Sequence, residues 1–290
     1  MTTTANPVQA PPPIATTAAP GARFTDLLAA EWIKLRSLRS TYWALGASAL
    51  GIIGFNANAA RSDYVNYPRM PDMMREAHAE FALRDAFTLG AAMILVLAAA
   101  SIGAITIVGE YGTGLIRTTF AAVPARRALM AAKVTVVTAL MTVYGTFIAS
   151  ASFAATQAIL SGRNADVSLS YPGAWRVVVA SALLAPVCAL AGMGLGAVIR
   201  HSATTMVAIT GVLLLLPAFV TDRYRWTAAV RDALPFNAWT RLVDMAYGHN
   251  PYLVYPRYYP ETTTGSWVVF GAWAIVAGGV AVVVVDRRDV

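Results

Sequence analysis

The chain has 290 residues, of which 57% are hydrophobic and 13% are charged, and its net charge is +7. The charged share is about half that of an average soluble domain. Because the charges lie between long apolar blocks, the composition excludes a soluble globular protein and predicts an integral membrane protein. Basic and aromatic residues do not interleave, so the positive charge points to anionic lipid headgroups rather than to nucleic acid.

The first segment, residues 1–22, contains no charged residue and five of the fifteen prolines of the chain. It has neither the basic start nor the apolar middle of a secretory signal. We therefore expect a disordered tail rich in Pro, Ala and Thr.

Residues 23–40 predict an amphipathic helix that lies in the membrane interface. An apolar stripe runs along one face of this helix and consists of Phe24, Leu27, Leu28, Leu35 and Leu38. Glu31 falls within the stripe, where a carboxylate facing lipid is costly. We expect Glu31 to meet a partner or a neighbouring loop; the alternative is a passive anchor helix whose Glu31 reaches the headgroups.

Six stretches are apolar over nearly the length of about 20 residues that a membrane span requires. They are residues 41–59, 86–108, 134–160, 176–199, 205–221 and 267–285. The fifth stretch is short, and Asn56 and Asn58 make the C-terminal end of the first stretch less hydrophobic.

Residues 109–133 leave the membrane after the second span and return directly into the third. On a helical wheel one half is apolar, with Tyr111, Leu115, Ile116, Phe120, Ala122 and Val123. Glu110, Thr113 and Arg117 lie on the other half, and Pro124 ends the predicted helix. A carboxylate in the first turn, such as Glu110, is favoured by the helix dipole. The residues alone leave open whether this helix binds a partner or rests passively in the headgroups.

Two later segments carry structural signals. In "GMGLGAVI" (192–199), two glycines four residues apart predict close helix packing in lipid rather than a dinucleotide loop. Residues 222–266 are rich in Tyr and Trp, which is typical of an interfacial belt. Within them we expect two short helices broken at Pro235, which dip toward the bilayer or cap a cavity.

Chemistry-bearing residues are scarce. The interiors of the six predicted spans contain no Asp, Glu, Lys, Arg or His, which disfavours a proton-coupled carrier and an intramembrane enzyme. No phosphate-binding loop of the G-x-x-x-x-G-K-[ST] type occurs. Five polar span residues either bond between helices or line a path: Asn56, Thr138, Thr142, Gln157 and Ser181.

Six spans place both termini on one side. Lys and Arg divide equally between the two sides, so the positive-inside rule gives no majority. The first span has Lys34, Arg36 and Arg39 before it against Arg61 after it. Because the first helix usually dominates orientation, we expect cytoplasmic termini.

Several stretches together resemble the membrane subunit of the type-2 ABC transporter permease family, particularly its actinobacterial members. They are "AAEWIKLRSLRSTYW" (29–43), "GEYGTGLIRTTFAAVPARR" (109–127), "GLGAVIRHS" (194–202) and, less sharply, "LPFNAW" (234–239). The resemblance covers residues 23–290, and its most specific motif is the second stretch. Tyr111 departs from the pattern, because many relatives carry a charged residue there.

The resemblance implies that the helix between spans two and three is a coupling helix held by a separate cytoplasmic ATPase. Carried over to this chain, the coupling residues would be Glu110, Thr113, Ile116 and Arg117, with Glu31 on the N-terminal helix as a second element.

The expected protein is an all-α integral membrane protein of the plasma membrane. The interfacial helix (23–40) precedes a six-span permease domain (41–290). This chain would be a non-enzymatic transport subunit of an exporter, paired with a second permease chain, the same or homologous. Two copies of the ATPase would bind the ATP and magnesium, so that this chain binds no cofactor itself. The alternative is a membrane assembly or immunity subunit that translocates nothing.

Overall fold

The computed structural model describes residues 23–122, 125–221, 223–244 and 262–287. Within these ranges the fold is entirely helical and contains no strand. The predicted tail (1–22), Pro124 and most of the aromatic segment (245–261) lie outside the described residues.

The chain begins with two helices, α1 (Phe24–Ser37) and α2 (Arg39–Asn66), which bend at Leu38. The following elements are η1 (Tyr67–Arg69), α3 (Asp72–Glu76), α4 (His78–Ala86), α5 (Leu89–Gly112), α6 (Leu115–Ala122) and α7 (Arg126–Leu160). The second half consists of η2 (Ser161–Arg163), α8 (Ala174–Ile199), α9 (Ser202–Thr210), η3 (Gly211–Leu215), α10 (Leu216–Phe219), α11 (Arg225–Asp232), α12 (Pro235–Val243) and α13 (Thr263–Arg287).

Among the described residues, five helical segments are long and apolar enough to cross a membrane. They are His78–Gly112, Arg126–Arg163, Ala174–Ile199, Ser202–Phe219 and Thr263–Asp286. These segments match the second to sixth predicted spans and fit a membrane protein. The first predicted span, 41–59, lies within α2, which is long enough but is not among the five, so the sixth crossing stays a prediction.

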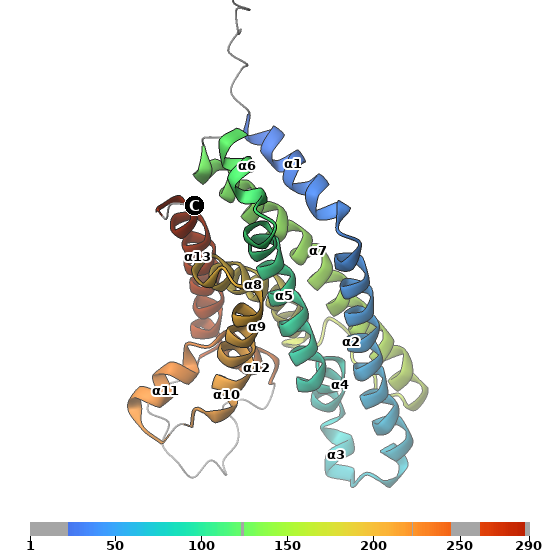
Figure 1. The fold of residues 1–290 in the computed structure, drawn as a ribbon. Coiled ribbons are helices and arrows are strands. Elements are labelled where there is room, and N and C mark those ends of the chain that lie inside the picture. Colours follow the sequence, from blue (N-terminus) through green and yellow to red (C-terminus); the bar gives the residue numbers. More distant parts are fainter. Residues whose placement is uncertain (1–22, 123–124, 222, 245–261, 288–290) are drawn as a thin grey trace, which may run out of the picture.

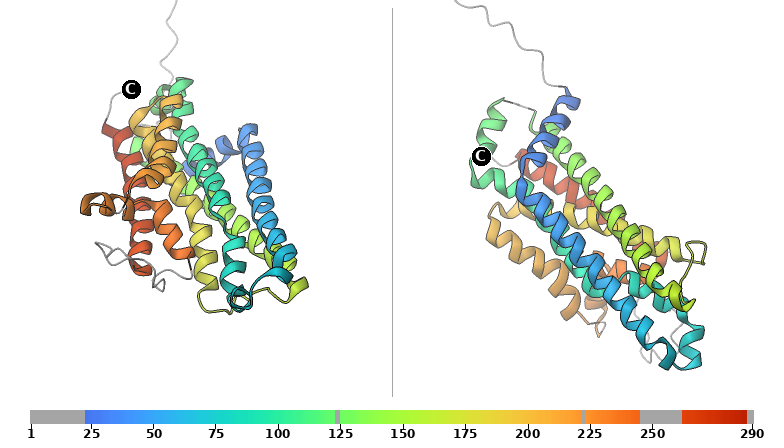
Figure 2. Two further views of the ribbon diagram at one scale, coloured as in Figure 1. Left: turned by 90° about the horizontal axis from the view of Figure 1, so that it is seen from below. Right: turned by 90° about the vertical axis from the view of Figure 1, so that its right-hand side faces the viewer.

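The helices form a bundle with α8 at its centre, packed against α5, α7 and α13 (Figure 1). The start of α1, α6 and the C-terminal end of α13 lie at one end of the bundle, and α3 lies at the other. Figure 2 shows the same division in the side view. An ion pair of 2.6 Å from Arg127 Nε to Asp286 Oδ2 joins the start of α7 to the end of α13 at the first end. We call this end the α6 end.

Small residues bring α5 and α8 together until their backbones touch. A Cβ atom added to Gly192 would lie 2.0 Å from the carbonyl oxygen of Ala100, and one on Gly103 would lie 2.0 Å from that of Ala189. Side chains at these positions would therefore force the helices apart. The structure confirms that the glycines of "GMGLGAVI" serve helix packing.

A proline inside α8 creates a second close contact. Pro186 has no N–H, so the carbonyl of Ala182, four residues earlier, loses its usual helical partner. That carbonyl faces Gly145 of α7, where an added Cβ would lie 2.1 Å from the oxygen. The missing side chain of Gly145 lets α7 approach the freed carbonyl.

The fifth predicted span is interrupted. Residues Gly211–Leu215 form a π-helical turn, and Pro217, the second residue of α10, follows one residue later. Pro217 cannot donate to the carbonyl of Leu213, and its ring would clash there in a regular helix. The wider turn accommodates the proline.

The predicted break at Pro235 is confirmed, since Pro235 is the first residue of α12 and two residues separate it from the end of α11. The side chains of Phe236 and Trp239 are buried, with Trp239 2% exposed, whereas Trp226 on α11 is 70% exposed. These aromatic residues therefore divide between the bundle interior and its surface.

Candidate functional site

The candidate site is a group of four charged side chains at the α6 end, contributed by three helices. The amphipathic pattern of α1 turns Leu27, Glu31 and Leu35 toward the bundle, where all three are buried. Lys34 lies one turn after Glu31 on the same helix. The remaining two members are Glu110, in the last turn of α5, and Lys133, in the second turn of α7.

The four groups form a closed ring in which each lysine contacts both glutamates. Lys133 Nζ donates to Glu31 Oε2 at 2.5 Å and to Glu110 Oε1 at 2.8 Å. Lys34 Nζ donates to Glu31 Oε1 at 2.9 Å and to Glu110 Oε1 at 3.2 Å. The ring therefore ties α1, α5 and α7 together, and its formal charges cancel.

The inner half of the ring is withdrawn from solvent. The side chains of Glu31 and Lys133 are 3% and 5% exposed, while that of Lys34 is 41% exposed. Burial alone lowers the pKa of Lys34, but hydrogen bonds and charges from Glu31 and Glu110 outweigh it, so that its pKa is raised above 10.5. Burying charges is tolerated here because every member has partners of opposite sign.

A cavity of about 260 Å³ lies beside the ring, between α1, α5 and α7. The four charged residues form part of its wall, and apolar side chains such as Leu38, Ile105 and Val136 form the remainder.

The helix α6 follows the ring after a sharp turn. Gly114 has a φ of +70°, a left-handed conformation that glycine adopts without a Cβ clash. The turn swings α6 back on the bundle, where Ile116 and Phe120 are 3% and 9% exposed. The guanidinium of Arg126 lies 4.9 Å from the centre of the Phe120 ring and covers it.

The tip of this connection faces outward. Gly112, Thr113, Gly114 and Leu115 are all exposed, and Leu115 is 54% exposed. We call residues 112–115 the tip. It offers both an apolar side chain and a hydroxyl group, although the Thr113 hydroxyl donates to the Gly109 carbonyl at 2.8 Å.

Tyr111, where the family pattern usually has a charged residue, contacts another part of this chain. The guanidinium of Arg200, the C-cap of α8, lies 4.8 Å from the centre of its ring. Two of the stretches that carry the family resemblance thus meet directly through a cation–π contact.

The structure brings two of the five predicted coupling residues, Glu31 and Glu110, into the ring. Thr113 is exposed on the tip, whereas Ile116 is buried and presents no surface to a partner. Arg117 lies on α6, but its side chain is not among the described parts of the chain.

Sequence reasoning missed the roles of Lys34 and Lys133. The signal was a lysine three residues after a glutamate in an apolar stripe, together with a lysine directly before an apolar span. Spacing along the chain does not show that the two meet the same carboxylates.

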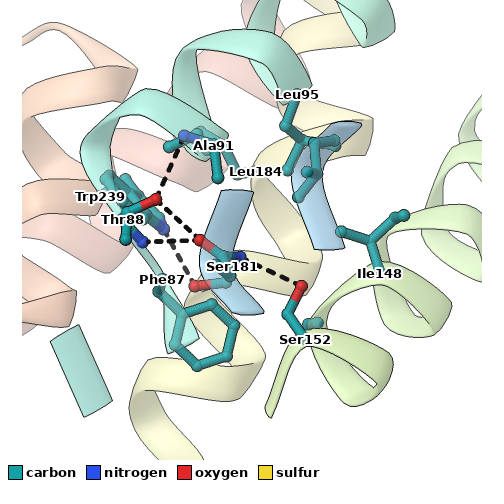
Figure 3. A pocket seen from close by; sticks show the side chains of 13 residues that line it. Phe87, Thr88, Ala91, Leu95, Ile148, Ser152, Ser181, Leu184 and Trp239 are labelled. Atoms are coloured by element: carbon teal, nitrogen blue, oxygen red, sulfur yellow. Dashed lines mark hydrogen bonds between the residues drawn. The ribbon is translucent and has the colours of Figure 1, made fainter. Parts of the chain in front are cut away.

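The polar residues inside the spans mainly hold helices together. Asn56 Oδ1 on α2 accepts from Thr88 Oγ1 at 2.7 Å, and Asn56 Nδ2 donates to Ser152 Oγ at 3.1 Å (Figure 3). Nearby, Trp239 Nε1 on α12 donates to Ser181 Oγ on α8 at 3.1 Å. These contacts line a cavity of only about 20 Å³, too small for a substrate.

The other three polar span residues bond locally. The hydroxyls of Thr138 and Thr142 donate to carbonyls four residues earlier in α7. Gln157 Oε1 accepts from the Val167 amide at 2.6 Å. In the described chain, these bonds engage both hydroxyls and Gln157 Oε1, whereas Gln157 Nε2 is buried without a hydrogen-bond partner.

A larger cavity of about 560 Å³ lies between α4 and the α11–α12 pair. Its lining includes the buried aromatic residues Phe87, Phe236 and Trp239 and the charged residues Arg84 and Glu80. The volume falls in the range of ligand pockets.

Comparison with models of known protein families finds no matching family, and comparison with curated protein sequences finds no match. Buried and half-buried ion pairs join α1 to the apolar helices α5 and α7, and the exposed tip follows directly after α5.

Proposed function

We propose that this chain is the permease subunit of an ATP-binding cassette transporter, an exporter whose path forms between two permease chains. A separate cytoplasmic ATPase drives it, and the tip after α5 is the point that the ATPase holds. The proposal combines the resemblance of residues 23–290 to type-2 permeases with the arrangement of the α6 end. It also takes the membrane as the plasma membrane and the termini as cytoplasmic.

The observation that carries the proposal is the four-charge ring. A passive connection between two spans needs no buried ion pairs, and burying charges brings little net stability over apolar packing. The ring does join α1, α5 and α7 mechanically, directly beneath an exposed tip. Such an arrangement would transmit a displacement of the tip to α1, α5 and α7 at the same time.

Two routes lead inward from the tip. One passes through Glu110 and the ring to α1 and α7. The other passes through Ile116 and Phe120, which are packed into the hydrophobic core. Movement of the tip by an ATPase would therefore displace helices of the bundle rather than only the loop.

The test is co-purification of the chain with the ABC ATPase encoded beside its gene. Leu115→Asp places a charge on an exposed apolar side chain of the tip, so we expect at least tenfold less ATPase to co-purify. ATP hydrolysis stimulated by the permease should fall with it. Interface residues whose loss costs more than about 1 kcal/mol are few, so Thr113→Arg serves as a second, bulkier block.

The matched control is Trp226→Asp, which makes the same chemical change at a residue 70% exposed on α11. It should retain the ATPase. Wild-type levels of ATPase binding and hydrolysis in both Leu115→Asp and Thr113→Arg would refute the proposal that the ATPase binds the tip. Ile116→Asp is unsuitable, because a charge at this buried position would disturb packing irrespective of any partner.

A further inference from the structure

The cavity of about 560 Å³ between α4 and the α11–α12 pair combines apolar and charged walls. Phe236 and Trp239 of α12 are buried in its lining, and their rings stack with centroids 5.7 Å apart. Glu80 and Arg84 of α4 bring opposite charges, and Asn237 of α12 brings an amide. A mainly apolar lining with a few polar groups that fix orientation is typical of ligand pockets.

The two charges on α4 are not used to bind each other. Glu80 precedes Arg84 by four residues, a spacing at which opposite charges on a helix usually pair. In the described chain neither of them forms an ion pair, and the guanidinium of Arg84 instead lies 4.9 Å from the centre of the Phe81 ring. Both residues are exposed. A carboxylate and a guanidinium on one wall of the cavity are therefore available to a ligand that carries both charges.

Asn237 adds an acceptor on the facing helix. Its side chain is nine-tenths buried, with 9% exposed, and its Nδ2 donates to the Arg231 carbonyl at 3.1 Å. Its Oδ1 atom accepts no hydrogen bond from the described residues. An acceptor at a largely buried residue is costly to leave unused, and an ammonium group of a ligand would supply the missing donor.

The order of polar and apolar residues along the chain matches a membrane lipid. Glu80 and Arg84 lie in the first two turns of the apolar segment His78–Gly112, and Phe87 and Leu89 follow them in the cavity lining. Leu89 is 56% exposed. At the end of a membrane span charges meet headgroups, and the apolar residues farther along the span meet acyl chains. The charged part of the lining thus lies toward the headgroups.

We propose that this cavity binds one zwitterionic phospholipid with a primary ammonium group, phosphatidylethanolamine. Arg84 contacts the phosphate, which guanidinium groups bind well. Glu80 and Asn237 Oδ1 accept from the ammonium, and the apolar lining contacts the first carbons of the acyl chains. Two arginines and two acidic residues line the cavity, so that their formal charges cancel and a net negative lipid is not favoured. The proposal concerns binding alone and is independent of the transport proposal.

The test uses the purified full-length chain, delipidated in detergent and titrated with dioleoylphosphatidylethanolamine. Native mass spectrometry counts the lipid molecules that stay bound. We expect one lipid to bind at a concentration at least tenfold below that needed for dioleoylphosphatidylglycerol. Glycerophosphoethanolamine, which has the same headgroup without acyl chains, distinguishes a membrane lipid from a soluble source of this chemistry. It should not displace the bound lipid at equal concentration.

Two variants separate the roles of the charges. Arg84→Gln should weaken binding of the ethanolamine lipid about tenfold, because a hydrogen bond to a charged group contributes about 1.5–3 kcal/mol. Glu80→Gln should weaken the same lipid and bind the glycerol lipid better, so that the preference between the two lipids narrows. A change of preference is a readout that a merely structural role of Glu80 would not produce.

The matched controls are Glu76→Gln and Arg69→Gln, which make the same changes at exposed residues outside the cavity lining. Both should bind the lipid as wild type does, and gel filtration of every variant checks the fold.

Three outcomes would overturn the proposal. The first is equal binding of the two lipids by the wild-type chain, which would indicate an unspecific annular lipid. The second is an equal loss in the controls and in the cavity variants. The third is displacement of the lipid by glycerophosphoethanolamine at equal concentration, which would assign the cavity to a soluble ligand.

Discussion

At the scale of residues, the ring of Glu31, Lys34, Glu110 and Lys133 shows how burial changes the importance of a charge. Lys133 is the inner cation and faces two carboxylates at a position closed to water, whereas Lys34 reaches the same carboxylates from the solvent side. The two lysines have the same chemistry and the same partners. They differ in exposure: water can solvate the carboxylates in place of Lys34, whereas it does not reach Lys133.

Lys133→Met should therefore destabilise the chain much more than Lys34→Met. Removing Lys133 leaves Glu31 buried with one partner fewer, and breaking a buried pair costs about 3–5 kcal/mol. Lys34 is partly exposed, where ion pairs contribute about 0–1 kcal/mol. Thermal unfolding in detergent compares the two variants directly. Equal effects would mean that the ring is open to water.

The pH dependence of Lys34 follows from its raised pKa. The folded-state pKa lies above the ordinary value of 10.5, so the contribution of Lys34 to stability is fully present below pH 10.5. It is lost as the pH rises through the folded-state value. The stability difference between wild type and Lys34→Met should thus be constant from about pH 7 to pH 10 and shrink above pH 10.5. A difference that persists unchanged at higher pH would contradict this assignment.

At the scale of elements, glycines set the distance between the central helices. Gly192 and Gly103 allow the backbones of α8 and α5 to touch, and Gly145 allows α7 to reach the carbonyl freed by Pro186. Lipid provides little hydrophobic force between helices, so close backbone packing has a large share in holding such a bundle together.

Gly192→Ala should destabilise the bundle by about 1–3 kcal/mol, the usual cost of overpacking. The added methyl would meet the Ala100 carbonyl, which is backbone and cannot rotate away. Gly54→Ala is the control, because a Cβ there meets nothing within 4 Å and alanine is the better helix former. Unfolding midpoints that do not separate the two variants would show that α5 and α8 are not in backbone contact.

At the scale of the whole molecule, the mechanism depends on which side of the membrane the α6 end faces. The start of α1, α6 and the end of α13 share one end of the bundle, so a single orientation decides the location of all three (Figure 1). The equal division of Lys and Arg in the sequence leaves this question to experiment.

Labelling of single cysteines with a membrane-impermeant maleimide decides the orientation. With the α6 end in the cytoplasm, Thr113→Cys should react only after lysis and Thr262→Cys should react on intact cells. Both threonines are exposed, and the native Cys188 is 0% exposed, so that the background signal is low. The reverse pattern would place the tip outside the cell, beyond the reach of a cytoplasmic ATPase.

Sequence alone determined the helical class, five helices of the length and apolarity that a membrane span requires, the helix α1 with Leu27, Glu31 and Leu35 on its buried face, and the break at Pro235, although Phe24 and Leu38 of the predicted apolar stripe are exposed. These features depend on apolar length, on periodicity and on the missing N–H of proline, which are all local properties. It also singled out Glu31 as a carboxylate that needs a partner.

Only the tertiary structure decided what that partner is, because Lys133 lies 102 residues away from Glu31 and packing brings them together. It also turned Ile116 from the expected surface into the core, since a helical wheel divides a helix into faces but does not say which face meets the bundle. The cavity lined by Glu80 and Asn237 likewise depends on how α4 and α12 converge. Contacts between distant segments follow from the packing of whole helices, and no local pattern encodes them.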